Sequence, residues 1–404
     1  MRPAFPNIVG AASMAVQRLV LTNFRCYESL RMTIESPLVV LTGSNGAGKT
    51  NLLEAISFLV PGRGLRTARL IDLARRNNTD SEINQCWAVA ATVNGLGGVY
   101  DVGTGVSEEV AVEKLRRVVR INGVPARGQS ALGEKLAALW LTPDMQRLFT
   151  DGASGRRRFL DRLVFGFDPA HAGRLKSFER SLRDRSRLLQ NTLKQGKAAD
   201  PAWLNVLEKT IVEKGVAITA ARIALINRLN PACAMGVGPF PSASLELDGV
   251  LDSWLRTMPA VEVEDRYRSV LLTSRDVDQG GRATTIGPHH SDLMVMHIRK
   301  NAPASQCSTG EQKALLISIV LANARLQSLE KGAVPILLLD EIAAHLDEER
   351  RGALYSEILA LGAQAWMTGT DPSLFAPLLG KAQYFSVANA KLNEYSPEAI
   401  DKQI

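Results

Sequence analysis

The sequence is poor in cysteine and has no long apolar run, and both absences exclude whole classes of protein. Its four cysteines among 404 residues lie far apart and form no C-x-x-C pair, so neither a zinc site nor a disulfide framework is expected. No apolar stretch approaches the ~20 residues that a membrane-spanning helix needs, and the N-terminal residues lack the apolar core of a signal peptide. We therefore expect a cytoplasmic protein with no membrane partner.

Aromatic residues are also few, and we find no internal repeat or low-complexity tract. Phe, Trp and Tyr make up 5% of the chain, so base stacking on single-stranded nucleic acid is not expected to dominate any binding. Positive charge is present in excess, because the formal net charge is +7. This excess is consistent with a polyanionic partner, although many basic proteins bind no nucleic acid.

The positive charge is concentrated in one segment. Residues 151–200 contain twelve Lys or Arg against six Asp or Glu, an excess of six positive charges. Guanidinium groups suit phosphate contacts that do not read the base sequence, and we predict that Arg180, Arg183 and Arg187 contact DNA. The alternative is a solvated helix face whose charges pair locally, as Arg180 could with Asp184. The charge pattern does not separate the two.

Periodicity predicts an α/β domain that is interrupted by a mostly helical insertion. Strand patterns fill residues 16–41, and the continuous apolar run at 36–41 is typical of a strand that is covered on both faces. A helical pattern follows over 51–59, and from about 143 to 232 the patterns are mainly helical. After about residue 283 the alternation of strands and helices resumes.

Two apolar stripes mark the insertion. Leu204, Ile211, Ile218 and Leu225 recur every seven residues, while Leu175, Phe178, Leu182 and Leu189 form an earlier stripe. The segment between them, KQGKAADP, has turn composition. We therefore predict an antiparallel hairpin of two helices, with an ordinary compact bundle as the alternative.

The stretch from Gly43 to Thr50, GSNGAGKT, fits the pattern G-x-x-x-x-G-K-[ST] and lies between a predicted strand and a predicted helix. Its glycines allow backbone N–H groups to turn inward around phosphate oxygens, next to a helix N-terminus that favours anions. Lys49 is expected to reach the β- and γ-phosphates of a nucleotide, and Thr50 to bind Mg²⁺. The complete predicted phosphate-binding set is Gly43, Ser44, Asn45, Gly46, Ala47, Gly48, Lys49 and Thr50.

Two acids, Asp340 and Glu341, follow the apolar run ILLL. At the end of a buried parallel strand, a carboxylate can lie beside the phosphate loop. We predict that Asp340 helps to hold Mg²⁺ and that Glu341 polarises the attacking water, with Lys49 and Glu341 as the catalytic pair. The alternative for two such acids is a plain helix N-terminus.

The segment STGEQ, Ser308–Gln312, precedes an amphipathic helix. Ser308 with Glu311 three residues later is the pattern of a capping box, which is a purely structural explanation. However, a phosphate loop, then S-x-G-E, then an apolar run with two acids is the order that ABC-type ATPases show. In that class the serine and glycine contact the γ-phosphate bound by the opposing subunit, which would assign Ser308 and Gly310 to a shared nucleotide site.

Further segments extend the resemblance over nearly the whole chain from about Val16. They are TNFRCYESL (22–30), GSNGAGKTNLLEAI (43–56), GRGLRT (62–67), LTPDMQRLFTDGASGRRRFLDRL (141–163), GPHHSDL (287–293) and STGEQKALL (308–316). In this order they resemble the bacterial RecF family of SMC-like ATPases.

The resemblance implies an α/β fold, an ABC/SMC-like P-loop ATPase head with an inserted helical arm. It implies an N-terminal extension at 1–15, which we expect to be disordered, the first part of the head at 16–140, the arm at 141–279 and the second part of the head at 280–404. It also implies ATP and Mg²⁺ as cofactors, an ATP-dependent homodimer and weak, DNA-dependent ATP hydrolysis. The expected function is that of a recombination mediator in DNA repair and replication restart, which binds double-stranded or gapped DNA without sequence preference and acts with RecO and RecR.

Three positions depart from the family pattern. His290 follows His289 where an arginine is usual, Cys307 precedes the signature in place of leucine, and AWMTGTD (365–371) has no switch histidine. The last departure leads us to expect slow hydrolysis. Two alternative functions remain, the nucleotide-binding subunit of a membrane transporter and a structural SMC-like DNA protein whose ATP site is vestigial.

Overall fold

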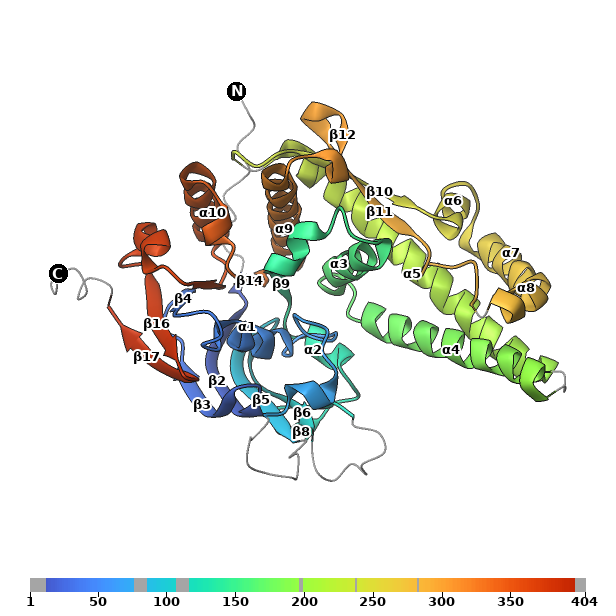
Figure 1. Ribbon diagram of the computed structural model, residues 1–404, viewed down its shortest axis with the longest axis horizontal. Helices are drawn as coiled ribbons and strands as arrows, with labels where there is room; N and C mark the ends of the chain where they lie inside the picture. Colours follow the sequence, from blue (N-terminus) through green and yellow to red (C-terminus); the bar gives the residue numbers. More distant parts are fainter. Residues whose placement is uncertain are drawn as a thin grey trace. The chain divides into compact units, whose positions relative to one another are not determined.

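The computed structural model describes residues 12–75, 86–106, 116–195, 199–236, 238–281 and 283–396 (Figure 1). The chain forms two compact units. The first unit comprises Met1–Gln146, Met235–Ser242 and Ser308–Ile404, and the second comprises Arg147–Ala234 and Ala243–Cys307. No helix within the described ranges combines the length and the apolar character needed to cross a bilayer.

A mainly parallel sheet forms the centre of the first unit. Its strand order is β17-β16-β4-β15-β14-β9, and only β17 runs antiparallel to its neighbour. The strands are β4 (Leu38–Thr42), β9 (Ala138–Leu141), β14 (Ile336–Leu339), β15 (Ala365–Gly369), β16 (Ala382–Ala388) and β17 (Lys391–Tyr395). Every residue of the apolar runs in β4, β9, β14 and β15 is buried, as a parallel sheet covered on both faces requires.

An antiparallel sheet, in the order β3-β2-β5-β6-β7-β8, forms the second layer of this unit. Its strands are β2 (Ala15–Phe24), β3 (Tyr27–Thr33), β5 (Trp87–Gly95), β6 (Gly98–Val106), β7 (Val118–Ile121) and β8 (Val124–Pro125). Side chains alternate between buried and exposed along β3 and β5, so one face of the sheet packs into the core and the other faces solvent. A short parallel pair, β1 (Ala12–Ser13) and β13 (Ala333–Val334), lies apart from both sheets.

The first unit has four α-helices and four 3-10 turns within the described ranges. They are α1 (Lys49–Ser57), α2 (Ser130–Gly133), α9 (Thr309–Lys331) and α10 (Glu348–Leu361), with η1 (Leu70–Leu73), η2 (Pro143–Arg147), η5 (Ala343–His345) and η6 (Pro372–Leu378). Leu52, Leu53 and Ile56 of α1 share one apolar cluster with both sheets. In that cluster Phe24, Phe58 and Trp87 pack edge to face. The phosphate-loop helix is therefore anchored in the core.

Helices dominate the second unit. They are α3 (Ala153–Phe165), α4 (His171–Gln195), α5 (Pro201–Met235), α6 (Val250–Thr257), α7 (Ala260–Thr273) and α8 (Arg275–Gly281), with η3 (Ile298–Lys300) and η4 (Ala304–Gln306). Three strands, β10 (Ala243–Asp248), β11 (Asp292–His297) and β12 (Ala302–Pro303), form a small antiparallel sheet.

The predicted hairpin is confirmed, and α4 and α5 lie side by side in Figure 1. Phe178 of α4 lies against Gly215 of α5, and Arg185, further along α4, pairs with Glu208, earlier in α5. The two helices therefore run antiparallel. The heptad residues Leu204, Ile211, Ile218 and Leu225 are all buried. Residues 196–198 of the predicted turn lie outside the described residues.

Two of the expected domain ranges differ from the units. The second unit continues to Cys307, beyond the expected end of the arm at 279, because β11 and β12 pair with β10 rather than with the head sheets. In the expected N-terminal extension, Ala12 and Ser13 form β1 and Ala15 begins β2, and Met14 between these strands is buried. Residues 1–11 lie outside the described residues.

Candidate functional site

The loop 43–48 joins β4 to the first turn of α1, in the place that the sequence predicted. Gly48 has φ of 116°, and a Cβ there would lie 2.7 Å from the Tyr27 hydroxyl and 2.9 Å from Cys26 Sγ. At Gly43, a Cβ would collide with the carbonyl oxygen of Val387. Glycine is therefore required at both ends of the loop for conformational and steric reasons.

Lys49 is buried and folds back over this loop. Its Nζ donates hydrogen bonds to the carbonyl oxygens of Gly43, at 2.6 Å, and Ser44, at 2.9 Å. Burial lowers the pKa of Lys49, and the negative charges of Glu341 and Asp340 act in the opposite direction. The ammonium group is thus held beside the glycine-rich backbone, near two acids.

Asp340 lies next to Thr50, although the two are 290 positions apart in the sequence. The Thr50 hydroxyl lies 2.9 Å from Asp340 Oδ1 and 3.1 Å from Oδ2. Burial raises the pKa of Asp340, while hydrogen bonds from Thr368 and Thr50 oppose this rise. A hydroxyl and a carboxylate at this spacing fit Mg²⁺, which proteins hold through one or two carboxylates together with substrate phosphates. The described residues contain no cluster of three His, Cys, Asp or Glu that could bind a metal unaided.

Thr368, on the neighbouring strand β15, connects the two acids. Its hydroxyl donates to Asp340 Oδ1 at 2.8 Å and accepts the backbone N–H of Glu341 at 2.9 Å. Glu341 has φ of 54°, in the left-handed region that non-glycine residues seldom adopt. Thr368 was not among the predicted site residues, although its place directly after the apolar residues AWM of AWMTGTD was an available signal.

A second group of polar side chains, also missed, surrounds α1. Arg25 donates two hydrogen bonds of 2.8 Å to the buried carboxylate of Glu54. Arg66 donates to Asn51 Oδ1 at 3.1 Å and lies 3.9 Å from Glu54. Asn51 in turn donates to Cys26 Sγ. Arg25 and Cys26 come from TNFRCYESL, Arg66 comes from GRGLRT, and Asn51 and Glu54 come from the extended phosphate-loop segment. Three of the segments that carry the family resemblance therefore meet around the phosphate-loop helix.

Ser308 and Gly310 lie at the start of α9. The Ser308 hydroxyl accepts the N–H of Glu311 at 3.4 Å, and the Glu311 carboxylate accepts the N–H of Ser308 at 3.1 Å, so the capping box predicted as the structural explanation is present. Ser308 is exposed, and Glu311 is half-buried. Within the described residues, no hydrogen bond joins Ser308 or Gly310 to the phosphate loop. In a single copy of the chain, the two parts of the predicted nucleotide site are therefore not joined by a hydrogen bond.

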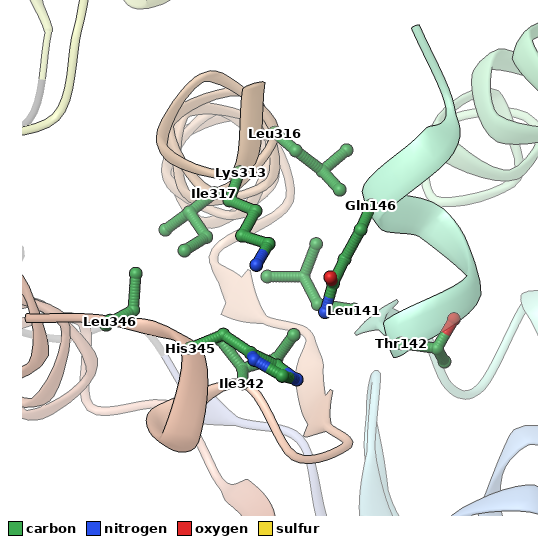
Figure 2. A pocket seen from close by; sticks show the side chains of 9 residues that line it. All are labelled: Leu141, Thr142, Gln146, Lys313, Leu316, Ile317, Ile342, His345 and Leu346. Carbon is green, nitrogen blue, oxygen red and sulfur yellow. The ribbon is translucent and has the colours of Figure 1, made fainter. Parts of the chain in front are cut away.

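A small hollow lies between α9 and the segment that follows Glu341. Figure 2 shows Lys313, Leu316 and Ile317 on the α9 side of the hollow, and His345, Ile342 and Leu346 on the opposite side. Its volume of about 10 Å³ is at the lower limit for holding one water molecule and is far too small for a nucleotide. This hollow is therefore a packing feature beside the candidate site rather than part of it.

The three arginines predicted to contact DNA are exposed on α4, and each has an acidic neighbour. Arg180 and Arg187 lie 3.6 Å and 3.9 Å from the Asp184 carboxylate, and Arg183 lies 3.8 Å from Glu179. Such local ion pairs are what the alternative interpretation, a solvated helix face, predicted. Arg185, which the sequence analysis counted in the same basic segment, is fully buried in ion pairs with Glu208 and Asp278.

The comparisons with known proteins agree with this architecture. The family model of the RecF/RecN/SMC N terminal domain matches residues 15–376. Two curated relatives, the DNA replication and repair protein RecF of Mesorhizobium japonicum and that of Rhizobium etli, are 47% and 46% identical over 378 and 382 residues. These matches cover 93% and 94% of this chain and 97% and 98% of the relatives.

Solved structures show the same fold at low sequence identity. The recombination mediator protein RecF with ATPrS has a TM-score of 0.81 at 20% identity, covering 96% of this chain and all of that chain. The Smc head domain of Pyrococcus furiosus has a TM-score of 0.51 at 16% identity, covering 96% of this chain and 98% of that chain. The fold is thus that of an SMC-type ATPase head with an inserted helical arm. Within that class, the chain belongs to the bacterial RecF family.

Proposed function

We propose that this protein is an ATP-controlled DNA-binding clamp that acts in recombinational DNA repair. One observation carries the proposal: Thr50, Asp340, Thr368 and Glu341 meet beside a glycine-rich loop that already holds the Lys49 ammonium. Their sequence separation means that only the fold assembles them. A nucleoside triphosphate with Mg²⁺ is the ligand whose phosphates, charge and metal ion match this set of groups.

The residues then have distinct tasks. The backbone N–H groups of 43–48 and the ammonium of Lys49 bind the phosphates, and Thr50 and Asp340 hold Mg²⁺, which neutralises the negative charge of the phosphates. Glu341 is the general base that orients and polarises water. Burial raises the pKa of Asp340, and the hydrogen bonds that Thr368 and Thr50 donate to its carboxylate oppose this rise and favour the charged form that a metal ligand needs.

Dimerisation completes the site in this proposal. Ser308 is exposed and Gly310 is half-buried at the N-terminus of a 23-residue helix, where the helix dipole favours an anion. A second copy could present this end to the γ-phosphate bound by the first. ATP binding would then close two copies of the chain on DNA, and slow, DNA-stimulated hydrolysis would release them.

The repair role and the partners follow from the relatives. The curated relatives are named DNA replication and repair proteins, and the solved RecF structure is described as a recombination mediator in the RecFOR pathway. We extend to this chain the binding of double-stranded or gapped DNA and partnership with RecO and RecR.

Sedimentation velocity with ATP, ADP or no nucleotide tests the proposal. Glu341→Gln should accumulate an ATP-bound dimer, because it keeps the binding groups and removes the base. Lys49→Ala, the matched control, should remain monomeric. DNA binding measured under the same three nucleotide conditions should be strongest with ATP. A Glu341→Gln protein that sediments only as a monomer at saturating ATP would refute the clamp.

A further inference from the structure

The solvent-facing side of the antiparallel sheet carries an open hollow with a volume of about 400 Å³. It lies across β2, β5, β6 and β7, and the residues that define it are Arg18, Val20, Ala90, Asp101, Gly103 and Arg120. None of these residues belongs to the phosphate loop, to the acids after β14 or to α9. The hollow is therefore a feature that the proposed ATPase site does not use.

The floor of the hollow consists of small side chains. Val20, Ala90 and Gly103 are register partners on adjacent strands, and Arg120 is the partner of Gly103 on the next strand. A Cβ on Gly103 would meet no atom within 4 Å, so internal packing does not require glycine there. Glycine inside a strand weakens the strand and often marks a place where a ligand or another backbone approaches closely.

Arginines border this floor on both sides. Arg31 of β3 is the register partner of Val20, and it is exposed, as are Arg18 and Arg120. Four strand spacings separate Arg31 from Arg120, a distance of about 19 Å between their backbones. Within the described residues, none of the three arginines makes an ion pair. Asp101 is the single acid among the residues that line the hollow, and it accepts a hydrogen bond of 2.8 Å from Thr92.

This chemistry favours a peptide over a nucleic acid. The floor offers apolar contact, which a phosphate backbone does not use, and no aromatic side chain lines the hollow for base stacking. An extended peptide can set small apolar side chains on the floor, and carboxylates toward the two ends of the bound segment can reach the arginines that border the floor. We propose that this surface docks an extended, acidic segment of a partner protein.

Fluorescence anisotropy of a labelled peptide of alternating Glu and Val tests the inference, with a Lys–Val peptide as its charge-reversed counterpart. Gly103→Leu fills the floor without changing charge, and the double substitution Arg18→Glu and Arg120→Glu reverses charge at two exposed positions. Each should weaken binding of the Glu–Val peptide by roughly tenfold or more. Arg180→Glu with Arg183→Glu on α4, the matched control, should leave peptide binding unchanged. Binding should also weaken as salt is added.

Three outcomes would overturn the inference. Equal peptide affinity in all variants would show that no docking surface exists here, and preference for the Lys–Val peptide would contradict the charge assignment. Loss of duplex DNA binding instead of peptide binding in the hollow variants would make the occupant a nucleic acid. ATP-dependent dimerisation of the same variants should match the unmodified protein, so a failure here is distinguishable from a failure of the clamp proposal.

Discussion

At the scale of single residues, the candidate site depends on hydroxyl groups as much as on the acids and the lysine. Thr368 is fully buried, and its one hydroxyl both donates to Asp340 and accepts from the backbone of Glu341. Because Glu341 is held at a positive φ, this hydrogen bond helps to maintain a conformation that costs about 1–3 kcal/mol. The hydroxyl therefore contributes to both the charge state of Asp340 and the position of Glu341.

We predict that Thr368→Val slows ATP hydrolysis by roughly 10–100-fold, the effect of losing a hydrogen bond to a charged group worth about 1.5–3 kcal/mol. Valine conserves the volume and removes only the hydroxyl. Nucleotide affinity should change much less than the turnover rate, as measured by single-turnover hydrolysis and equilibrium binding. Thr368→Ser is the control and should retain most activity. An unchanged rate in the valine variant would show that the hydroxyl has no role in hydrolysis.

His289 provides a residue-scale prediction for stability. The pKa of His289 is lowered from 6.5 to about 4, mainly by burial. A hydrogen bond to the Thr284 carbonyl partly opposes this lowering, and the charges of His290, Arg157 and Arg222 add to it. Its neighbour His290 also contacts this carbonyl, with the two ring centroids 4.2 Å apart. The unfolded chain therefore binds a proton at this histidine at a higher pH than the folded chain does.

The sign of the effect follows from this difference. The free energy of unfolding should be unaffected by His289 above about pH 6.5 and should fall as the pH drops toward 4, because protonation favours the unfolded chain. Denaturant unfolding at several pH values should show a smaller loss of stability in His289→Gln than in the unmodified protein. Identical pH profiles for the two proteins would mean that His289 titrates normally in the folded state.

At the scale of secondary-structure elements, the start of α9 shows that a structural and a functional interpretation can hold for the same residue. Ser308 caps the helix and is also the residue predicted to meet the nucleotide of a second copy. The structural part is observed directly. The functional part needs a substitution that preserves the cap.

Ser308→Asp makes this separation. Aspartate is as good an N-cap as serine, so the thermal stability should stay within the ~1 kcal/mol that a whole cap contributes. A carboxylate facing the γ-phosphate should, however, abolish the ATP-dependent dimer through like-charge repulsion. Ser308→Ala is the complementary control, because it removes the cap without adding charge. Normal ATP-dependent dimerisation of Ser308→Asp, seen by light scattering, would leave Ser308 with a capping role alone.

At the scale of the whole molecule, one arginine of the basic segment 151–200 is buried in ion pairs within the second unit, and others are exposed on the surface. Arg185 forms buried ion pairs with Glu208 and Asp278, and these pairs link α4, α5 and α8. Arg180, Arg183 and Arg187 remain on the surface, where Asp184 and Glu179 offset part of their charge. The basic segment is thus a weaker candidate DNA surface than its composition alone indicates.

We predict that reversing Arg180, Arg183 and Arg187 to glutamate weakens DNA binding and lowers its salt dependence, by up to about 0.9 in slope for each phosphate contact that is lost. Asp184→Asn with Glu179→Gln should act in the opposite direction, because it releases the three arginines from their acidic neighbours. Titrations of duplex DNA at several salt concentrations measure both effects. An unaltered slope in the charge-reversed protein would place the DNA surface on other elements.

The sequence by itself determined the features that consecutive residues carry. The phosphate loop, the apolar strand before Asp340 and the heptad stripe from Leu204 to Leu225 each depend on spacing within one short segment, because backbone conformation and periodic burial are local properties. These features, with the family resemblance, were enough to predict the α/β head, the helical hairpin and the RecF family.

Only the tertiary structure decided what depends on strand register and on contacts between distant segments. The pairing of β14 with β15 sets Thr368 beside Asp340, and the packing of α4 on α5 buries Arg185 among acids that no local pattern assigns to it. The small-residue floor around Gly103 likewise exists only because four strands align in one register. Register and long-range packing are set by the free energy of the whole fold, which no short window of sequence contains.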